Sequence, residues 1–276
     1  MDIRYASSPL ETAAMNTEAL RNHFLIETLF ETGAIRLTYS HYDRTIIGGA
    51  MPGETPLAVP EVPELRASHL LERRELGIIN IGHTGSVLAG EMRYTLNKLD
   101  CLYLGQGTAP ITFSSEDPNR PAQFFLLSDP AHQNYPNRLI TAAEASPTRL
   151  GALETANTRT IYKYIHPDGI ASCQLVMGLT ILEPGNVWNT MPPHTHDRRM
   201  EVYCYFDMPE GQRVLHLMGQ PDQTRHLWVS NRQAIISPPW SIHAGCGTAA
   251  YTFIWGMAGE NQSFSDMDFL ALGSLA

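Results

Sequence analysis

Short runs of apolar residues, some alternating with polar ones, recur along most of the chain, and Gly, Pro, Asn and Asp separate them. Runs of this length that are rich in β-branched and aromatic residues indicate β-strands. Many short strands at regular spacing are typical of a β-barrel or a β-sandwich. The expected strands cover residues 34–39, 44–47, 77–81, 101–104, 123–127, 173–182, 214–218, 234–236 and 251–255.

Helical periodicity is convincing mainly near the start of the chain. Residues 16–30 place apolar side chains three and four positions apart after Asn16, a residue that caps helix N-termini well. A second, short helix is expected to begin at Thr141, because Thr141 and Glu144 have the spacing of a capping box. A further turn is expected at 263–266. The pattern therefore predicts an all-β protein with a few short helices.

Three histidines and one glutamate have the spacing of a metal site. His194 and His196 are two positions apart, so on an extended segment their imidazoles point to the same side. Glu201 opens an alternating stretch, and a bend before it would bring its carboxylate beside the imidazoles. His243, after a Pro-Pro turn, supplies a fourth ligand. This donor set suits Zn, Mn, Fe, Ni or Co better than Ca or Mg.

The same four residues match the two-part signature of the cupins. In that pattern a His-x-His pair, a spaced Glu and a later His converge inside a small β-barrel. Two details differ here. Trp240 stands where cupins usually carry glycine, and Gly185 lies farther before His194 than is usual. The second difference predicts a longer loop leading into the first motif, with the ligands retained.

Length and faint internal echoes predict two tandem cupin (double-stranded β-helix, jelly-roll) barrels. The chain has 276 residues, and Arg73-Arg74-Glu75 echoes the segment from Arg198 to Glu201. The first half lacks the His-x-His pair and the late histidine. We therefore expect residues 1–150 to form a metal-free cupin-like barrel and residues 151–276 to form the barrel that holds the metal.

Composition narrows the partners of the protein. The net charge of −9 argues against a nucleic acid or an anionic membrane as partner. The sequence contains no run of 18 apolar residues that could span a membrane, and the N-terminus lacks the apolar core of a signal peptide. Its four cysteines are scattered without a C-x-x-C motif. A reduced, cytoplasmic protein is expected.

Six stretches carry a more detailed resemblance, residues 40–44, 71–82, 191–203, 216–221, 241–243 and 253–262. Through them the chain resembles one family, the 5-keto-4-deoxyuronate isomerases, from about residue 20 to residue 268. The resemblance implies a bicupin ketol-isomerase that converts 5-dehydro-4-deoxy-D-glucuronate into 3-deoxy-D-glycero-2,5-hexodiulosonate during the breakdown of pectin and other sources of unsaturated uronates. It further implies a homo-hexamer and one Zn²⁺ per subunit, held by the residues matching His194, His196, Glu201 and His243.

Isomerisation also needs a group that moves a proton and groups that hold a small uronate. Lys163, which alternates with aromatic residues, and Glu201, if it leaves the metal, are the candidate catalytic bases. Arg159 or Arg199 would bind the substrate carboxylate. Tyr203 shares a strand face with Glu201 and would line the pocket.

Two other functions are compatible with the metal ligands. Other cupins use three histidines and a glutamate for reactions with O₂, so a metal-dependent dioxygenase is one alternative. A non-catalytic sugar-binding bicupin is the other. Aerobic turnover with iron would favour the first alternative, and tight uronate binding without conversion would favour the second.

Overall fold

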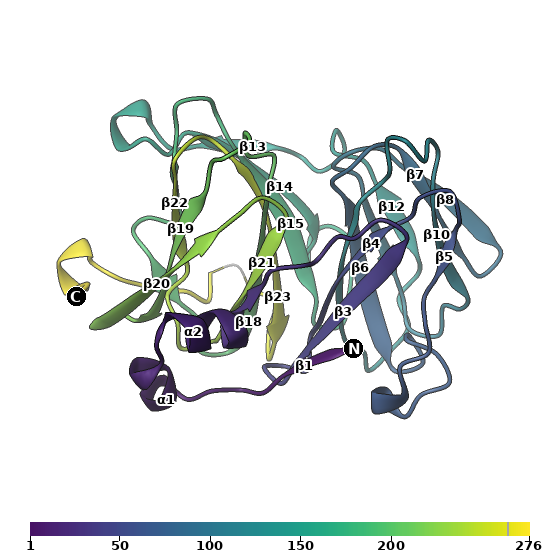
Figure 1. Cartoon of the computed structure of the whole chain (residues 1–276), viewed down its shortest axis with the longest axis horizontal. Coiled ribbons are helices and arrows are strands. Elements are labelled where there is room, and N and C mark those ends of the chain that lie inside the picture. Colours follow the sequence, from purple (N-terminus) through teal and green to yellow (C-terminus); the bar gives the residue numbers. More distant parts are fainter. Residues whose placement is uncertain (264) are drawn as a thin grey trace.

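Two β-barrels lie side by side in the structure, a computed structural model that describes residues 1–263 and 265–276 (Figure 1). Within these residues each barrel is built from one seven-stranded and one four-stranded sheet. Helices are few and short, and most of them lie near the N-terminus. The expected all-β class is therefore confirmed.

The core of the first barrel consists of apolar side chains from both of its sheets. Leu76, Phe113 and Phe124 are among them. Its strands pair antiparallel, except that β1 runs parallel to β3. A 3₁₀ turn, η1 (Pro63–Leu65), precedes β6. In order across the sheets, the strands are β1 (Asp2–Arg4), β3 (Ala34–Ser40), β4 (Ile46–Met51), β11 (Phe124–Pro130), β6 (Arg74–Asn80), β9 (Cys101–Leu104) and β12 (Arg138–Ile140), then β5 (Leu57–Ala58), β10 (Ile111–Ser115), β7 (Gly85–Ala89) and β8 (Met92–Leu96).

The second barrel repeats this arrangement and adds a small two-stranded sheet at its mouth. The 3₁₀ turns η2 (Leu153–Thr155) and η3 (Leu272–Ser274) lie outside its sheets. In order, the strands are β13 (Thr148–Leu150), β14 (Arg159–Ile165), β15 (Val176–Leu182), β23 (Thr252–Gly259), β18 (Arg199–Phe206), β21 (Gln233–Ser237) and β2 (Leu25–Ile26), then β16 (Trp188–Asn189), β22 (Ala244–Gly247), β19 (Val214–Gln220) and β20 (Gln223–Val229), and finally the pair β17 (His194–Thr195) and β24 (Asp268–Phe269).

The two seven-stranded sheets pack against each other through a core that both barrels share. One cluster of buried residues includes Ile79 and Leu127 from the first barrel together with Met177 and Val202 from the second. The backbones approach closely, since a Cβ atom on Gly77 would lie 2.6 Å from the Sδ of Met177. Apolar burial on this scale is the main force that holds the barrels together.

A buried carboxylate reinforces this interface. Glu75 of β6 is fully buried, and its Oε1 accepts hydrogen bonds from the backbone N–H groups of Gln174 (2.8 Å) and Leu175 (2.9 Å). Its Oε2 accepts from the N–H of Cys173 and the hydroxyl of Tyr103, both at 2.7 Å. Four donors compensate the desolvation of the charge. The first barrel thus fixes the backbone that leads into β15.

The N-terminal segment crosses from the first barrel to the second. Helices α1 (Pro9–Ala14) and α2 (Thr17–Phe24) lie beneath the second barrel in Figure 1, and β2 pairs with β21. Leu20 and Phe24 pack into the core of that barrel. The division expected at residue 150 stays a proposal, but residues 9–26 are packed on the second barrel, and β13 already belongs to its sheet at Thr148.

The expected strand positions agree with the observed strands, with ends that shift by a few residues. The helix expected over 16–30 begins as predicted after Asn16, whose side chain accepts a hydrogen bond from the N–H of Ala19. It ends at Phe24, because Leu25 and Ile26 pair with β21. Tertiary pairing thus overrides the helical pattern in its second half.

The helix expected at Thr141 is wrong. The capping-box bonds form, since the N–H and the hydroxyl of Thr141 donate to Glu144 at 2.8 and 2.7 Å, but the segment makes only a turn before Pro147. The turn expected at 263–266 includes residue 264, which lies outside the described residues. Helix α1, capped by Ser8 and Glu11, was not predicted.

The two barrels correspond strand by strand, and the correspondence corrects the sequence echo. β6 and β18 occupy the same place in their sheets, and each begins with an arginine, Arg74 and Arg199. In this alignment Leu76 takes the place of Glu201, while Glu75 faces the other barrel. The echoing glutamates are therefore one residue out of register, and on a strand one residue reverses the face.

Candidate metal centre

The four predicted ligands lie together at one end of the second barrel. His194 is on β17, His196 is in the turn that follows, Glu201 is on β18, and His243 directly precedes β22. Their ligand atoms all lie within 4.8 Å of one another. The structure therefore brings together four side chains that are spread over 50 positions of the sequence, from 194 to 243.

The donor atoms converge on a common point. The Oε2 of Glu201 lies 2.8 Å from the Nε2 of His243 and 3.1 Å from the Nε2 of His196. The Nε2 atoms of His243 and His194 are 3.0 Å apart. Three imidazole nitrogens facing one carboxylate oxygen are a donor set that suits a divalent transition ion. Within the described residues, the candidate group for a metal lies here, in the second barrel.

The backbone fixes the tautomer that a metal ligand needs. The Nδ1 of His196 lies 2.8 Å from the carbonyl oxygen of Arg199, so Nδ1–H donates there and Nε2 is the ring nitrogen directed at the other ligands. The Nδ1 of His243 faces the carbonyl of Ser241 at 3.4 Å. Hydrogen bonds of this kind orient imidazole rings before any ion binds.

Burial sets the charge state of the cluster. Burial, together with repulsion from His243, lowers the pKa of His194 to about 3, so this imidazole is neutral at pH 7. Burial opposes ionisation of Glu201, but His243 and His196 outweigh it and hold the pKa of this carboxyl well below its usual range. A neutral imidazole beside an ionised carboxylate is the state that metal binding requires.

A cavity of about 580 Å³ opens beside the ligands. This volume is within the range of small-molecule sites. Arg159, Ile161 and Lys163 line one side, because alternate residues of β14 point inward. Strand β18 contributes Glu201 and Tyr203. The remaining walls are largely apolar and include Met191, Phe253, Trp255, Met257 and Phe269.

All five predicted catalytic and substrate-binding residues line this cavity: Lys163, Glu201, Arg159, Arg199 and Tyr203. Lys163, one of two lysines in the chain, is half-buried and pairs across the sheet with Gly178. Arg159 is also half-buried and donates from Nη1 to the carbonyl of Asn157 at 2.9 Å. The hydroxyl of Tyr203 lies 3.0 Å from that of Thr190. Lys163 and Arg159 therefore line the same cavity as the predicted ligands His194 and Glu201.

Arg199, the other predicted carboxylate binder, is arranged differently. Only 1% of its surface is exposed, and its two Nη atoms donate to the backbone carbonyls of Ser263 and Asp266. The guanidinium reaches the cavity wall, but these hydrogen bonds commit its terminal nitrogens to the backbone. Of the two arginines, Arg159 has the better position for a substrate carboxylate, and both roles stay predictions.

Sequence reasoning missed several residues of the cavity wall. Phe253 and Trp255 lie on alternate positions of β23, and the same period-two pattern that predicts the strand could have identified them as inward-facing. The C-terminal residues Met267, Phe269 and Leu270 also line the cavity. They lie in a short segment with little periodicity, so their sequence gave no signal of a place beside the metal ligands.

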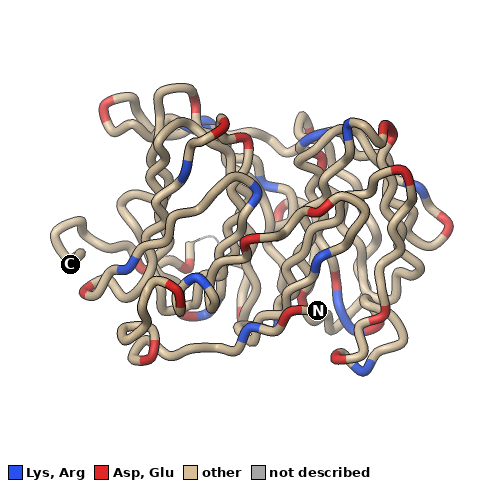
Figure 2. Tube along the Cα trace, in the orientation of Figure 1, with Lys and Arg blue, Asp and Glu red and all other residues tan. Residues whose placement is uncertain are grey.

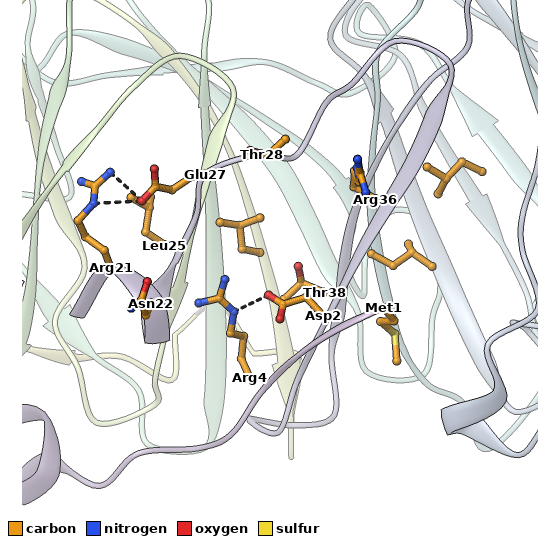
Figure 3. A pocket seen from close by; sticks show the side chains of 13 residues that line it. Met1, Asp2, Arg4, Arg21, Asn22, Leu25, Glu27, Thr28, Arg36 and Thr38 are labelled. Atoms are coloured by element: carbon orange, nitrogen blue, oxygen red, sulfur yellow. Dashed lines mark hydrogen bonds and ion pairs between the residues drawn. The ribbon is translucent and has the colours of Figure 1, made fainter. Parts of the chain in front are cut away.

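A second cavity, of about 420 Å³, lies between α2 and β2 on one side and β1 and β3 on the other (Figure 3). Its charged side chains neutralise each other. Arg21 points to Glu27, with its Nη2 2.9 Å from Oε1, and the Nε of Arg4 lies 2.7 Å from the carboxylate of Asp2. Because its arginines are already paired, this cavity is a weaker candidate for the functional site.

Charged residues do not gather on one part of the fold. Figure 2 shows basic and acidic residues interspersed over both barrels. Across the described residues, every helix is too short or too polar to cross a membrane. The four cysteines, all of them among the described residues, are free thiols.

Comparison with known proteins agrees with the geometry. A profile of the KduI/IolB family matches residues 26–272. A protein from Shouchella clausii is 56% identical over 275 residues, covering 100% of both chains, and is named 4-deoxy-L-threo-5-hexosulose-uronate ketol-isomerase. A protein of the same name from Agrobacterium fabrum is 51% identical and covers 100% of this chain and 98% of its own.

Solved structures confirm the fold. An IolB-like protein from Salmonella typhimurium superposes with a TM-score of 0.73 at 17% identity, covering 90% of this chain and 96% of its own. Oxalate decarboxylase from Bacillus subtilis gives 0.59 at 11% identity, covering 87% and 78%. At such low identity these likenesses establish the architecture alone, a pair of cupin-type barrels.

Proposed function

The chain belongs to the KduI/IolB family, and from this premise we propose that it is a ketol-isomerase of 4-deoxy-L-threo-5-hexosulose-uronate, which is 5-dehydro-4-deoxy-D-glucuronate. The reaction turns an aldehyde at C1 and a hydroxyl at C2 into a hydroxyl at C1 and a ketone at C2. The observation that carries the proposal is a cavity lined by Arg159, Lys163, His194 and Glu201. The last two belong to the cluster of three histidines and one glutamate.

The site suits the charge changes of this reaction. A proton must leave C2, negative charge must be held on oxygen, and a proton must return to C1. A divalent ion bound by the four ligands would act as a Lewis acid opposite that negative charge. We propose Zn²⁺, because zinc has no redox chemistry and the isomerisation needs none. Metal analysis of the purified protein tests this choice.

We assign the proton transfer to Lys163 in preference to Glu201. The carboxylate of Glu201 is 2.8 and 3.1 Å from two imidazoles of the cluster, so it is committed to the ligand set. Lys163 lines the same cavity from another strand, on the inward face of β14. From there its amine would take the proton from C2 and return it to C1 on the same face of the sugar.

The substrate carboxylate is assigned to Arg159, with Tyr203 beside it. Both line the cavity. Burial lowers the pKa of Arg159, and the nearby Tyr203 opposes this shift. A guanidinium can bind a carboxylate with two parallel hydrogen bonds and so fix the orientation of the sugar chain. The carbons to be isomerised would then lie at the metal end of the cavity.

Assembly and location are proposed on weaker grounds. The family resemblance favours a homo-hexamer, and exposed apolar residues such as Tyr5 (69%) and Leu10 (83%) offer surface for contacts between subunits. Sedimentation should then give six times the chain mass of 30.7 kDa. Free thiols on all four cysteines, each within the described part of the chain, support the reducing environment of the cytoplasm.

Turnover of the named substrate tests the function directly. The zinc-loaded protein is incubated with 5-dehydro-4-deoxyglucuronate, and NMR should show the C1 aldehyde signal replaced by a C2 ketone. His196→Ala and His243→Ala should lose the metal and the activity, because each removes a buried ligand. His226→Ala is the matched control, since His226 is exposed on β20.

Other outcomes would identify other functions. An unchanged substrate spectrum with the metal-loaded protein contradicts the isomerase. Oxygen consumption with an iron-loaded protein would indicate a dioxygenase, and saturable uronate binding without conversion would indicate a sugar-binding protein.

A further inference from the structure

His194 is the most exposed of the four ligands and the one that lies on the small sheet formed by β17 and β24. It lies on β17, a two-residue strand whose sheet partner is β24 near the C-terminus. His194 pairs with Phe269, and Thr195 pairs with Asp268. In addition, the N–H of Leu270 donates to the carbonyl of Pro193 at 3.1 Å. The backbone that carries this ligand is therefore held by the end of the chain.

Arg198 ties the C-terminal segment to the turn between the ligands. Its guanidinium forms an ion pair with Asp266, where Nε lies 3.1 Å from Oδ2, and its Nη2 lies 3.3 Å from the carboxylate of Asp268. The amide of Asn261 also donates to Asp266. Arg198 follows His196 by two residues, so these contacts connect both histidines of the pair to β24.

The final residue anchors the other end of the segment. The N–H of Thr224 donates to the carbonyl of Ala276 at 2.9 Å, and the N–H of Ala276 donates to the carbonyl of Pro221 at 3.0 Å. Figure 1 shows this end beside β20. Residues 265–276 thus contribute to the cavity wall through Met267, Phe269 and Leu270 and are held at both ends.

Phe269 is placed for contact with the site and not for core packing. Its side chain is 70% exposed, which is unusual for a phenylalanine in a folded chain. Its ring centre lies 5.8 Å from that of His194 at an interplanar angle of 66°, an edge-to-face arrangement. Phe269 also lines the cavity, together with Met267 and Leu270.

We propose that the C-terminal strand β24 completes the metal centre, with Arg198 and Phe269 as positioning residues for His194. Arg198 fixes the strand through Asp266 and Asp268, the strand fixes the backbone of His194, and the ring of Phe269 limits the orientation of the imidazole. The inference rests on the metal site of the proposed function. It adds that metal affinity depends on residues that are not ligands.

Zinc affinity tests the inference independently of turnover. The zinc dissociation constant and release rate of the full-length holoenzyme are measured by competition with a chromophoric chelator. Arg198→Gln should raise the dissociation constant about 10–100-fold, the range found when residues that orient metal ligands are lost. Charge exchange in the double variant Arg198→Asp, Asp266→Arg should recover part of the loss. Arg36→Gln, which breaks the exposed Arg36–Glu31 pair of the first barrel, should leave zinc binding unchanged.

A second variant covers the case in which Arg198→Gln fails to fold. Phe269→Ala removes an exposed ring, so the fold should persist while zinc release becomes several-fold faster and KM rises. Wild-type affinity and release rate in the folded Phe269→Ala and Arg198→Gln proteins would overturn the inference, even if the enzyme is active. If instead the wild type binds zinc but leaves the uronate unchanged, the proposed function fails and the positioning role stands on the zinc data.

Discussion

The imidazole of His196 is held from two sides, and this shows how single residues prepare the site. The Nδ1–H of His196 donates to the carbonyl of Arg199 at 2.8 Å, and the Nε2 of His196 lies 3.1 Å from Glu201. An imidazole held in one tautomer does not have to rotate or exchange a proton before it binds an ion. The same logic separates the predicted ligands from Arg159 and Lys163, the residues proposed to act on substrate, which line the cavity from β14.

Replacing Lys163 separates proton transfer from metal binding. Lys163→Met should lower kcat by about 10²-fold or more, the usual contribution of a general base, with zinc content unchanged. Lys98→Met is the matched control, because Lys98 is the other lysine of the chain and forms an exposed ion pair with Asp207. Steady-state kinetics measure kcat, and metal analysis measures the zinc content. An undiminished kcat in Lys163→Met would return the proton transfer to Glu201.

The buried carboxyl of Asp129 predicts a pH dependence of stability. Burial raises its pKa to about 7, although Thr45 and Arg74 oppose the shift. The folded protein therefore binds a proton more tightly than the unfolded chain, whose aspartates titrate near 3.9. Stability should fall as pH rises from about 4 to about 7 and then level off, at up to roughly 1.4 kcal/mol per pH unit.

Asp129→Asn removes this titration. The difference in melting temperature between the variant and the wild type should grow in favour of the variant as pH rises from 5 to 8. Thermal melts at several pH values measure that difference. A difference that stays constant across this range would mean that Asp129 is ionised in the folded protein throughout.

At the scale of elements, Glu75 links a strand of one barrel to a loop of the other. Three of its four hydrogen bonds reach residues about 100 positions away, the N–H groups of residues 173–175. A carboxylate can accept all four hydrogen bonds. A glutamine amide has only one acceptor oxygen, and its NH₂ group would face other donors at the second position. The loop that enters β15 therefore depends on the charge of one side chain.

Glu75→Gln should destabilise the protein by about 2–4 kcal/mol, because it leaves buried N–H groups without acceptors. Chemical denaturation measures the change, with Glu91→Gln, an exposed glutamate, as the control. Equal stability of the two variants would show that the interface between the barrels does not need the carboxylate.

Elements also show what sequence patterns can and cannot predict. Period-two apolar runs gave the strands, and ligand spacing gave the candidate site, since both depend on neighbours in the chain. The pairing of Leu25 with Ile235 and of His194 with Phe269 depends on contacts between distant segments. Thr141 makes its capping bonds without a helix, because a cap cannot extend a helix by itself. Local signals therefore predicted many of the strands and the start of α2, but they missed α1 and could not predict the ends that long-range pairing determines.

For the whole molecule, the shared core predicts that the two barrels unfold together. Residues from the seven-stranded sheets of both barrels form one buried cluster. The segment 9–26 packs on the second barrel, although it precedes most of the first barrel in the chain. All four tryptophans, at positions 188, 228, 240 and 255, lie in the second half of the sequence. Their fluorescence therefore reports on the second barrel, whereas far-ultraviolet circular dichroism reports on both.

The two signals should give coincident denaturation curves, because a cooperative unit has one transition. A fluorescence transition displaced from the dichroism transition would show that the barrels unfold separately. Glu75→Gln, which weakens the interface, should be the variant in which such a separation first becomes visible.

The crossing of β2 to the second barrel has a consequence for biosynthesis. Leu25 and Ile26 leave the ribosome more than two hundred codons before their partners, Ile235 and Ala234. Contacts this distant in sequence form slowly, and an unpaired apolar strand can associate with other chains. Until residues 234 and 235 emerge, the nascent chain carries an unpaired β2, so we expect this strand to be among the last to reach its native pairing.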